Sequence, residues 1–476
     1  MPKNVREPMS GIDLAWLRME SATTPMMVVA ILTLASRVSV SAVKALIEQR
    51  LLRFPRFKQR PVHDLTGTDW ETDPHFALDT HLHRLVLPPR AGQRQLESAA
   101  SELASTPLDP RYPLWQIHVI ERYRRGSALV ARFHHCYGDG AALVRVLGSL
   151  TDASTHSRPA PAVFTQVSPS PLSSWPLLGS AASLAEDVVG GALNIVSASL
   201  HALAHPRETA ALAQQVSNAT AELARIATLS DEPPTSLKGH LGLRKEVAWS
   251  DTLRLDEVKT IGHALDCTVN DVLLATVAGA LGRYLRERER IDDDLAIRAL
   301  VPVNLRPSNA EPALGNRFGL VFARLPIGER DPLARLMKVH RDMEDMKRSA
   351  QPLLSFWLLT AMGVLPGIIE TQAIDLFTSK ATLVISNVPG PQHPLFLGGA
   401  RIEQSLFWVP QAGRIGVGIS LLTYDGRVHF GAMTDGNLIP DPHRVAQAFA
   451  SEFEKLLLCV VSMQPPGGTA VSRRHA

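Results

Sequence analysis

The stretch Ala128-Leu-Val-Ala-Arg-Phe-His134-His135-Cys-Tyr-Gly-Asp139-Gly140 decides the fold of this chain. Its first six residues predict a buried strand, and a turn at residues 124–127 precedes them. Apolar residues then recur at helical spacing as far as Leu150, which predicts a helix that opens at Asp139-Gly140. The two histidines therefore lie where a strand gives way to a helix. Because histidine transfers protons well near neutral pH, this junction is the candidate catalytic site.

Neighbouring residues on a strand face opposite sides, so we expect one imidazole in the core and the other in a cleft as a general base. Such a pair cannot easily share one metal ion, and no other His, Cys or Asp group has metal-ligand spacing, so we expect no metal. Asp139 can either orient a histidine or cap the helix, and the structural cap is favoured. Gly140 would allow a tight turn and a close approach of the backbone.

Length and composition restrict the class of protein. A chain of 476 residues predicts two domains, and 45% hydrophobic with 20% charged residues is typical of a soluble globular protein. The net charge of +3 and a pI near 8.8 slightly favour an anionic partner or a membrane surface, whereas sparse aromatics and the lack of a long basic run disfavour nucleic acid. Three unpaired cysteines indicate a reducing, cytoplasmic setting. The apolar run at 26–35 is expected to be a strand and not a signal peptide.

Helical periodicity and strand alternation predict an α+β fold in three segments: an N-terminal half at 1–156, a linker with bridging helices at 157–236, and a C-terminal half at 237–476. The pattern predicts helices at 41–53, 96–104 and 444–460, a helix whose capping box is formed by Thr268 and Asp271, strands at 115–121 and 127–133, and a hairpin of strands 415–423 and 427–434. The uncharged stretch 352–369 is broken by Pro366-Gly367, which favours a buried or interfacial helix over a membrane span.

Four further groups of residues are candidate substrate contacts, each with a structural alternative. Trp115 can line a passage or fill the core. Asn270-Asp271 opens a helix, where free N–H groups suit an oxyanion, although Asp271 can be a cap alone. Ser386 and Asn387, placed after a strand at 381–385, can donate to an oxyanion or simply form a turn. Gly416 and Gly418 leave one strand face bare, for an acyl chain or for close packing.

Together these blocks resemble one known family. His134–Gly140 matches the HHxxxDG signature of CoA-dependent acyltransferases. With Pro113-Leu114-Trp115 before it, and Asn270-Asp271 and the NVPGP block at 387–391 after it, the order is that found in bacterial wax ester synthase/diacylglycerol acyltransferases. Blocks at 302–306 and 315–319 are also similar to the family, without an assignable role. Tyr112 stands where the family commonly has arginine. The resemblance runs from about residue 9 to residue 460.

The resemblance implies two chloramphenicol-acetyltransferase-like domains that form a pseudo-dimer with an active-site tunnel between them. It implies that His135 is the general base and that Asp139 is structural and paired with an arginine. The reaction would move a fatty acyl group from acyl-CoA to a fatty alcohol or diacylglycerol, without a cofactor. Lipid substrates imply peripheral attachment to the inner membrane or to lipid inclusions. Two alternatives stay open: a condensation-type enzyme that uses carrier-protein thioesters, and a non-catalytic lipid-binding protein.

Overall fold

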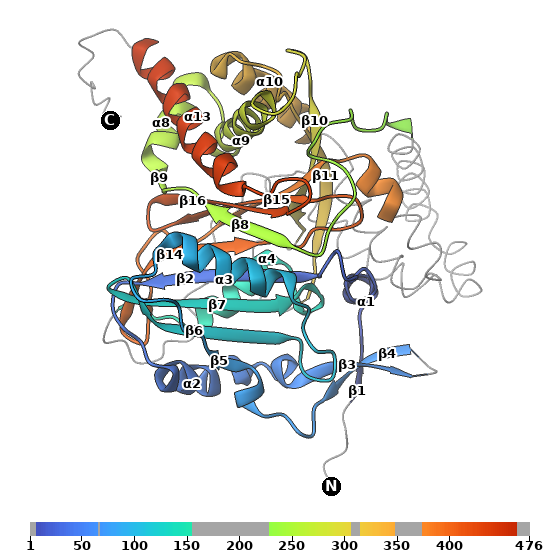
Figure 1. Ribbon diagram of the computed structural model, residues 1–476, viewed down its shortest axis with the longest axis vertical. Coiled ribbons are helices and arrows are strands. Elements are labelled where there is room, and N and C mark those ends of the chain that lie inside the picture. The colour runs from blue at the N-terminus through green and yellow to red at the C-terminus, as the bar shows by residue number, and fades with distance from the viewer. Residues whose placement is uncertain (1–5, 65–66, 155–227, 306–314, 348–373, 464–476) are drawn as a thin grey trace, which may run out of the picture.

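A computed structural model describes residues 6–64, 67–154, 228–305, 315–347 and 374–463 (Figure 1). Most of the predicted linker and bridging segment, at 157–227, and the apolar stretch at 352–369 lie outside these residues. The remaining chain forms two large β-sheets, a small three-stranded sheet, and helices around them. The α+β class predicted from the sequence is confirmed.

The N-terminal sheet has six strands, and the C-terminal sheet has seven. In spatial order the first contains β13 (Phe396–Leu397), β14 (Ala400–Trp408), β2 (Met27–Leu34), β7 (Gly126–His134), β6 (Trp115–Tyr123) and β5 (Leu82–Arg84). The second contains β11 (Phe318–Leu325), β10 (Ile297–Asn304), β12 (Leu383–Pro389), β15 (Val417–Tyr424), β16 (Arg427–Asp435) and β8 (Lys245–Trp249), with β9 (Leu253–Arg254) also on β16. The small sheet contains β1 (Arg6–Pro8), β4 (Gly67–Thr72) and β3 (Gln59–Asp64).

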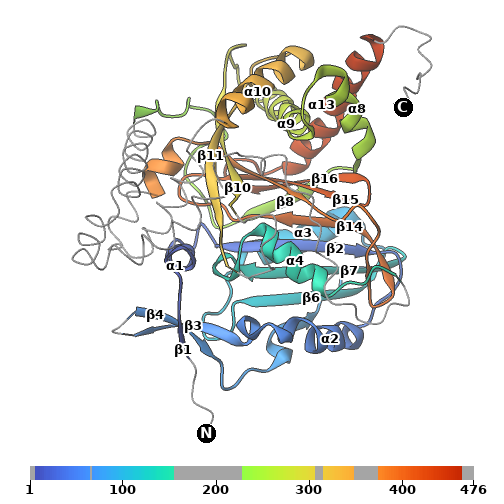
Figure 2. The same cartoon turned by 180° about the vertical axis from the view of Figure 1, so that it is seen from behind.

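The helices divide between the two sheets, as the two opposite views show (Figure 1, Figure 2). On the outer side of the C-terminal sheet lie α8 (Leu255–Leu265), α9 (Val269–Arg286), α10 (Pro332–Lys347) and α13 (Pro442–Met463). The N-terminal half contributes α1 (Gly11–Arg18), α2 (Val40–Gln49), α3 (Gln93–Ser105) and α4 (Gly140–Ser149). These helices agree with the predicted ones at 41–53, 96–104 and 444–460, with ends that shift by a few residues.

Local signals in the sequence are reproduced closely. The Thr268 hydroxyl accepts the Asp271 N–H, and the Asp271 carboxylate accepts the Thr268 N–H, so the predicted capping box begins α9. Asp425 and Gly426 both have positive φ, as a two-residue hairpin turn between β15 and β16 requires. One boundary differs: β12 continues through Pro389, so Ser386 and Asn387 lie inside a strand and not after it. Parallel pairing with β15 along its whole length extends that strand.

The strand β14 crosses from the C-terminal part of the chain into the N-terminal sheet, where it lies beside β2 (Figure 1). All eight residues of β2 are buried, so this strand cannot stand at an open edge. Pairing with β7 on one side and β14 on the other meets that need. The two sheets are therefore not built separately from the two sequence halves.

Helix α3 covers the edge of the other sheet. Three acceptors at helical spacing, Glu97, Ser101 and Ser105, receive the main-chain N–H groups of alternate residues of β8, namely Trp249, Val247 and Lys245, at 3.4, 2.9 and 2.8 Å. One helical step of four residues spans about 6 Å, close to two residues of a strand at about 6.7 Å, so the two series stay in step. The contact protects an otherwise open edge and joins the halves.

Among the described residues no single helix has the length and hydropathy of a membrane span. The pair α8 and α9 meets these criteria only when taken together, with a bend of 101° between them.

Candidate active site

The main chain of the two histidines is fixed on both sides. Strand β7 ends at His134, one 3-10 turn covers His135–Tyr137, and α4 begins at Gly140. The N–H of His134 donates to the Leu114 carbonyl at 2.9 Å, and the N–H of His135 donates to the Met26 carbonyl at 2.7 Å. Leu114 directly precedes β6 and Met26 directly precedes β2, so the two bonds hold the backbone of both histidines in place.

The His134 ring is held by polar partners. Its Nδ1 accepts the Cys136 N–H at 3.2 Å, so the proton of the neutral ring belongs on Nε2. That Nε2 lies 2.8 Å from a carboxylate oxygen of Glu20. His134 is 1% exposed, and this arrangement makes it a link between β7 and the segment that follows α1.

The His135 ring has a different environment. It stacks on the Trp16 indole with 4.0 Å between ring centroids and an angle of 24°, and Phe318 lies 6.0 Å away. Its Nδ1 is buried and has no hydrogen-bond partner among the described residues. Burial lowers the pKa of His135 to about 4, although the negative charge of Asp139 opposes this shift. The imidazole is therefore neutral at physiological pH and able to accept a proton.

A loop from the C-terminal half closes over this turn. Gly315 exchanges main-chain bonds with the HHxxxDG loop, donating to Tyr137 O at 3.1 Å and accepting from Asp139 N at 3.4 Å. The Asn316 amide donates to the carbonyl of His135 at 2.9 Å and to Asp13 at 2.8 Å. Burial raises the pKa of Asp13, which Asn316 partly offsets. These contacts give the block at 315–319 a role that its sequence alone does not reveal.

Asp139 joins the two halves through its carboxylate. One oxygen accepts the main-chain N–H of Ala142 at 2.9 Å and caps α4, and the other accepts the main-chain N–H of Arg317 at 3.0 Å. Beside it, a methyl group added to Gly140 would meet Phe407 and Val388 at an ordinary 3.8 Å. Close packing within the protein therefore does not demand glycine at position 140.

The remaining predicted substrate contacts fall in three places. Trp115 is fully buried, donates from Nε1 to the Phe57 carbonyl at 2.8 Å, and stacks on His81. Gly416 faces Leu241 and Leu438, whose methyl groups would lie within 2.7 Å of an added Cβ, so packing fills the space that was expected for an acyl chain. Around Gly418, an added Cβ would meet only carbonyl oxygens, none nearer than 3.5 Å.

Two of the predicted motifs meet. The Asn387 amide on β12 donates to the Asn270 side-chain oxygen at the start of α9, at 3.1 Å. Asn270 is 2% exposed, and its own NH₂ group has no hydrogen-bond partner among the described residues. Ser386, on the same strand, is also buried. No hydrogen bond links this asparagine pair to His135 within the described part of the chain, although Val388, next along β12, packs near Gly140.

An apolar crevice lies between α4 and the ends of β12 and β15. Its walls include Leu32, Val144 and Leu147 from the N-terminal half, and Pro391, Phe407 and Leu422 from the C-terminal part of the chain. Phe407, one of its wall residues, also approaches Gly140 at the start of α4.

Comparison with known proteins agrees with this geometry. The model of the wax ester synthase/diacylglycerol acyltransferase catalytic domain matches residues 9–273, more than half of the chain, and that of the WS/DGAT C-terminal domain matches residues 314–457. The chain belongs to this family of acyltransferases.

The matches to relatives and to solved structures cover most of the chain. A Mycobacterium tuberculosis protein named "Probable diacyglycerol O-acyltransferase tgs1" is 28% identical and covers 86% of each chain. The wax ester synthase/diacylglycerol acyltransferase of Marinobacter aquaeolei VT8 shares the fold, with a TM-score of 0.67 at 22% identity over 95% of this chain and 100% of that one. A trichothecene 15-O-acetyltransferase of Fusarium sporotrichioides superimposes with a TM-score of 0.60 at 12% identity, over 95% and 94% of the two chains.

In this acyltransferase the structure adds residues that sequence reasoning missed. Trp16, Glu20 and Asn316 contact the two histidines or their backbone from far away in the chain. Asn316 belongs to the block at 315–319, whose resemblance to the family gave it no role, and the structure places it directly after Gly315, whose φ is +108°. Nothing in the local sequence of Trp16 or Glu20 indicated a partner more than a hundred residues away.

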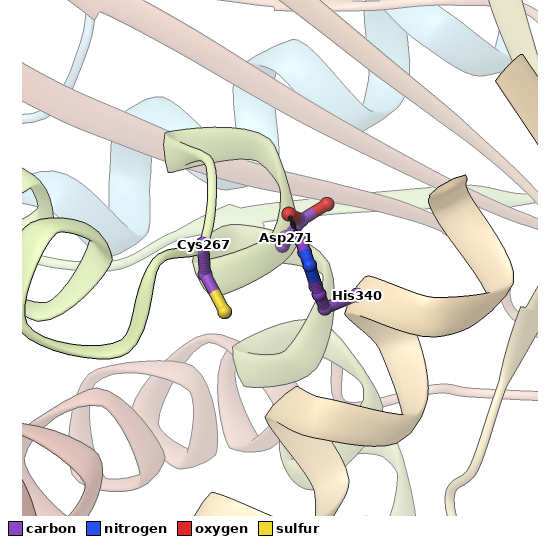
Figure 3. Close-up of side chains that lie close together, drawn as sticks. All are labelled: Cys267, Asp271 and His340. Carbon is purple, nitrogen blue, oxygen red and sulfur yellow. Dashed lines mark hydrogen bonds and ion pairs between the residues drawn. The ribbon is translucent and has the colours of Figure 1, made fainter.

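The structure also brings together three groups able to bind a metal. Cys267, Asp271 and His340 lie among the helices that cover the C-terminal sheet, with their ligand atoms within 4.8 Å of one another (Figure 3). Spacing along the chain could not show this, because His340 lies on α10, far from the other two residues in sequence.

Proposed function

We propose that this chain transfers a fatty acyl group from acyl-CoA to the hydroxyl group of a fatty alcohol or a diacylglycerol, with His135 as the general base. The observation that carries the proposal is the neutral imidazole of His135, stacked on Trp16 and fixed by a loop from the other half. Membership of the family and the names of the relatives support the class of substrates.

The proposed chemistry is direct transfer. His135 accepts the hydroxyl proton as the alcohol oxygen attacks the thioester carbonyl, and a C–O bond forms to give a tetrahedral intermediate. Collapse of this intermediate breaks the C–S bond, and the imidazolium returns its proton to the departing sulfur, so that free CoA leaves. His134 and Asp139 position this residue: His134 Nε2 lies 2.8 Å from a Glu20 carboxylate oxygen, and Asp139 caps α4 while it accepts the main-chain N–H of Arg317.

We place the acyl chain, or the alkyl chain of the acceptor, in the crevice between α4 and β15. Its walls are almost entirely apolar, and Phe407 brings it up to Gly140. A buried apolar chain is stabilised by about 0.8 kcal/mol per CH₂ group, so such a wall gives long chains an advantage. This assignment replaces the face of Gly416, which the side chains of Leu241 and Leu438 occupy.

Asn270 is our candidate for a polar contact with substrate. Asn387 fixes the orientation of its amide, and its NH₂ group is buried without a partner among the described residues. A buried donor without a partner costs stability, and a substrate oxygen that pairs with it would recover that cost. Ser386, Asp271 and Trp115 then support the site through packing and capping.

We further propose that the protein contacts a membrane or lipid inclusion peripherally. The substrates are lipids, the net charge is slightly positive, and three apolar side chains at the end of α13 are more than half exposed: Leu458, Val461 and Met463. Flotation with vesicles of anionic phospholipid tests this attachment. Recovery of all the protein in the vesicle-free fraction at low salt would refute it.

One assay decides the main proposal. Release of CoA from palmitoyl-CoA is measured with hexadecanol and with diacylglycerol offered separately, for the wild type and for His135→Ala. Loss of the base should slow the reaction about 10²–10⁴-fold, roughly 3–5 kcal/mol of barrier. If the folded wild type is inactive with every acyl-CoA, a carrier-dependent enzyme is favoured. Full activity of His135→Ala would exclude general base catalysis by this residue.

A further inference from the structure

Cys267, Asp271 and His340 form a cluster apart from the acyl-transfer site. Cys267 lies in the loop between α8 and α9, Asp271 in the first turn of α9, and His340 on α10, and the close-up shows their side chains converging (Figure 3). Their ligand atoms are all within 4.8 Å of one another, and His340 Nδ1 is 2.8 Å from the Asp271 carboxylate.

We propose that these three side chains bind one divalent cation of the Zn²⁺ class. A thiolate, an imidazole and a carboxylate are the donors that zinc takes in proteins, and three protein ligands leave a fourth position for water. Asp271 is 1% exposed, whereas Cys267 and His340 are partly exposed. An ion can therefore reach the cluster from solvent and still gain one buried, charged ligand.

The ligands are held in place before any ion arrives. The Asp271 carboxylate accepts the Thr268 N–H at 2.9 Å in the capping box, so its rotamer is fixed by the helix start. His340 then lies against that carboxylate from α10. Because the side chains are already ordered, binding costs little further conformational entropy.

The local charge also suits a cation. The carboxylates of Asp266 and Asp271 both lie close enough to the Cys267 sulfur to act on it electrostatically. Binding would release one proton from Cys267 to solvent. His340 would bind the ion through Nδ1, and that bond would replace its hydrogen bond to Asp271.

A purely structural reading makes a different prediction. The His340–Asp271 hydrogen bond alone would then connect α9 to α10, and Cys267 would only donate weakly to the Leu265 carbonyl, at 3.3 Å. Under that reading Cys267→Ser changes nothing, whereas a metal site requires the sulfur.

The full-length protein, stripped with a chelator, is titrated with Zn²⁺ against a chromophoric competitor and separately with Co²⁺. We expect one equivalent of Zn²⁺, a rise in thermal stability on binding, and a thiolate-to-cobalt charge-transfer band. Cys267→Ser should abolish that band and, like His340→Gln, weaken zinc binding by at least ~10-fold. Cys459→Ser, which changes a partly exposed thiol on α13, should bind as the wild type does.

Absence of saturable binding by the folded wild type would overturn the proposal, as would equal affinities of the wild type and Cys267→Ser. If His340→Gln does not fold, Cys267→Ser still decides the matter, because that thiol makes no strong contact in the structure. Acyl transfer is not the readout, so failure of the proposed enzymatic function would leave this result untouched.

Discussion

The side-chain amide of Asn316 donates a 2.9 Å hydrogen bond to the main-chain carbonyl of His135. The same amide donates to Asp13, so one residue of the C-terminal half supports both the turn that carries His135 and helix α1. Asn316→Ala should therefore lower the free energy of unfolding by about 1–3 kcal/mol, because two buried acceptors lose their donor.

The same substitution should slow CoA release, since the backbone of the proposed base loses a support. Chemical denaturation and steady-state assays measure the two effects. Asn437→Ala is the control, because this exposed asparagine makes no side-chain hydrogen bond with the described residues. Wild-type stability and rate in Asn316→Ala would show that the bridge is unimportant.

Substitution by alanine should lower the stability of the protein at one glycine of this site and leave it unchanged at another. Gly315 has φ of +108°, which strains any residue with a Cβ, although no atom lies within 4 Å of the added methyl group. Gly315→Ala should cost about 1–3 kcal/mol of stability from the backbone alone. Gly140→Ala adds a methyl group with contacts of 3.8 Å and should leave stability nearly unchanged. Equal thermal denaturation of both variants would contradict this account.

Acid should destabilise the protein well above the pH at which carboxylates titrate. Burial lowers the pKa of His118 to about 3 and that of His135 and His429 to about 4. The unfolded chain binds protons at these positions near pH 6.5 while the folded chain does not, so stability falls as the pH drops from about 6.5 to about 4. The limiting slope is roughly 1.4 kcal/mol per pH unit for each histidine.

Urea denaturation of the wild type and of His118→Phe at pH 7 and pH 5 tests this expectation. The variant should lose less stability between the two conditions than the wild type does. An identical loss in both proteins would mean that His118 titrates alike in the folded and unfolded states.

Trp16 should control the pH dependence of catalysis. Its indole covers the His135 ring at 4.0 Å and contributes to the burial that lowers the pKa of this imidazole. Trp16→Ala exposes the ring, so the acid limb of the rate profile should move up from about pH 4 toward about 6.5. Trp16→Phe keeps an aromatic cover and should shift the limb less. Profiles of kcat between pH 4 and pH 8 measure it, and a uniform loss of rate without a shift would indicate a role in packing only.

Several elements of the fold can be predicted from short stretches of sequence because contacts between residues that are close in the chain determine them. The strand before His134, the capping box at Thr268 and Asp271, and the turn at Asp425-Gly426 each depend on residues that are neighbours in the chain. Positive φ and helix capping leave a recognisable pattern of residue types, and the structure reproduces all three features.

What could not be predicted depends on partners far away in the chain. The pairing of β14 with β2, the contact of Asn316 with His135 and the approach of His340 to Asp271 leave no periodic or compositional trace. Similarly, Ser386 and Asn387 seemed to follow a strand because prolines come soon after them, at 389 and 391, but pairing with β15 keeps that segment extended. The bare face at Gly416 predicted open space, which leucines of other segments fill.

The insertion of β14 beside β2 also limits how the molecule can move. A chain divided before β8 would leave its first piece with the apolar flank of β2 unpartnered, so neither fragment should fold alone. The chain crosses into the N-terminal sheet after β12 and returns to the C-terminal sheet at β15, so the segments on either side of β14 tether the two sheets to each other.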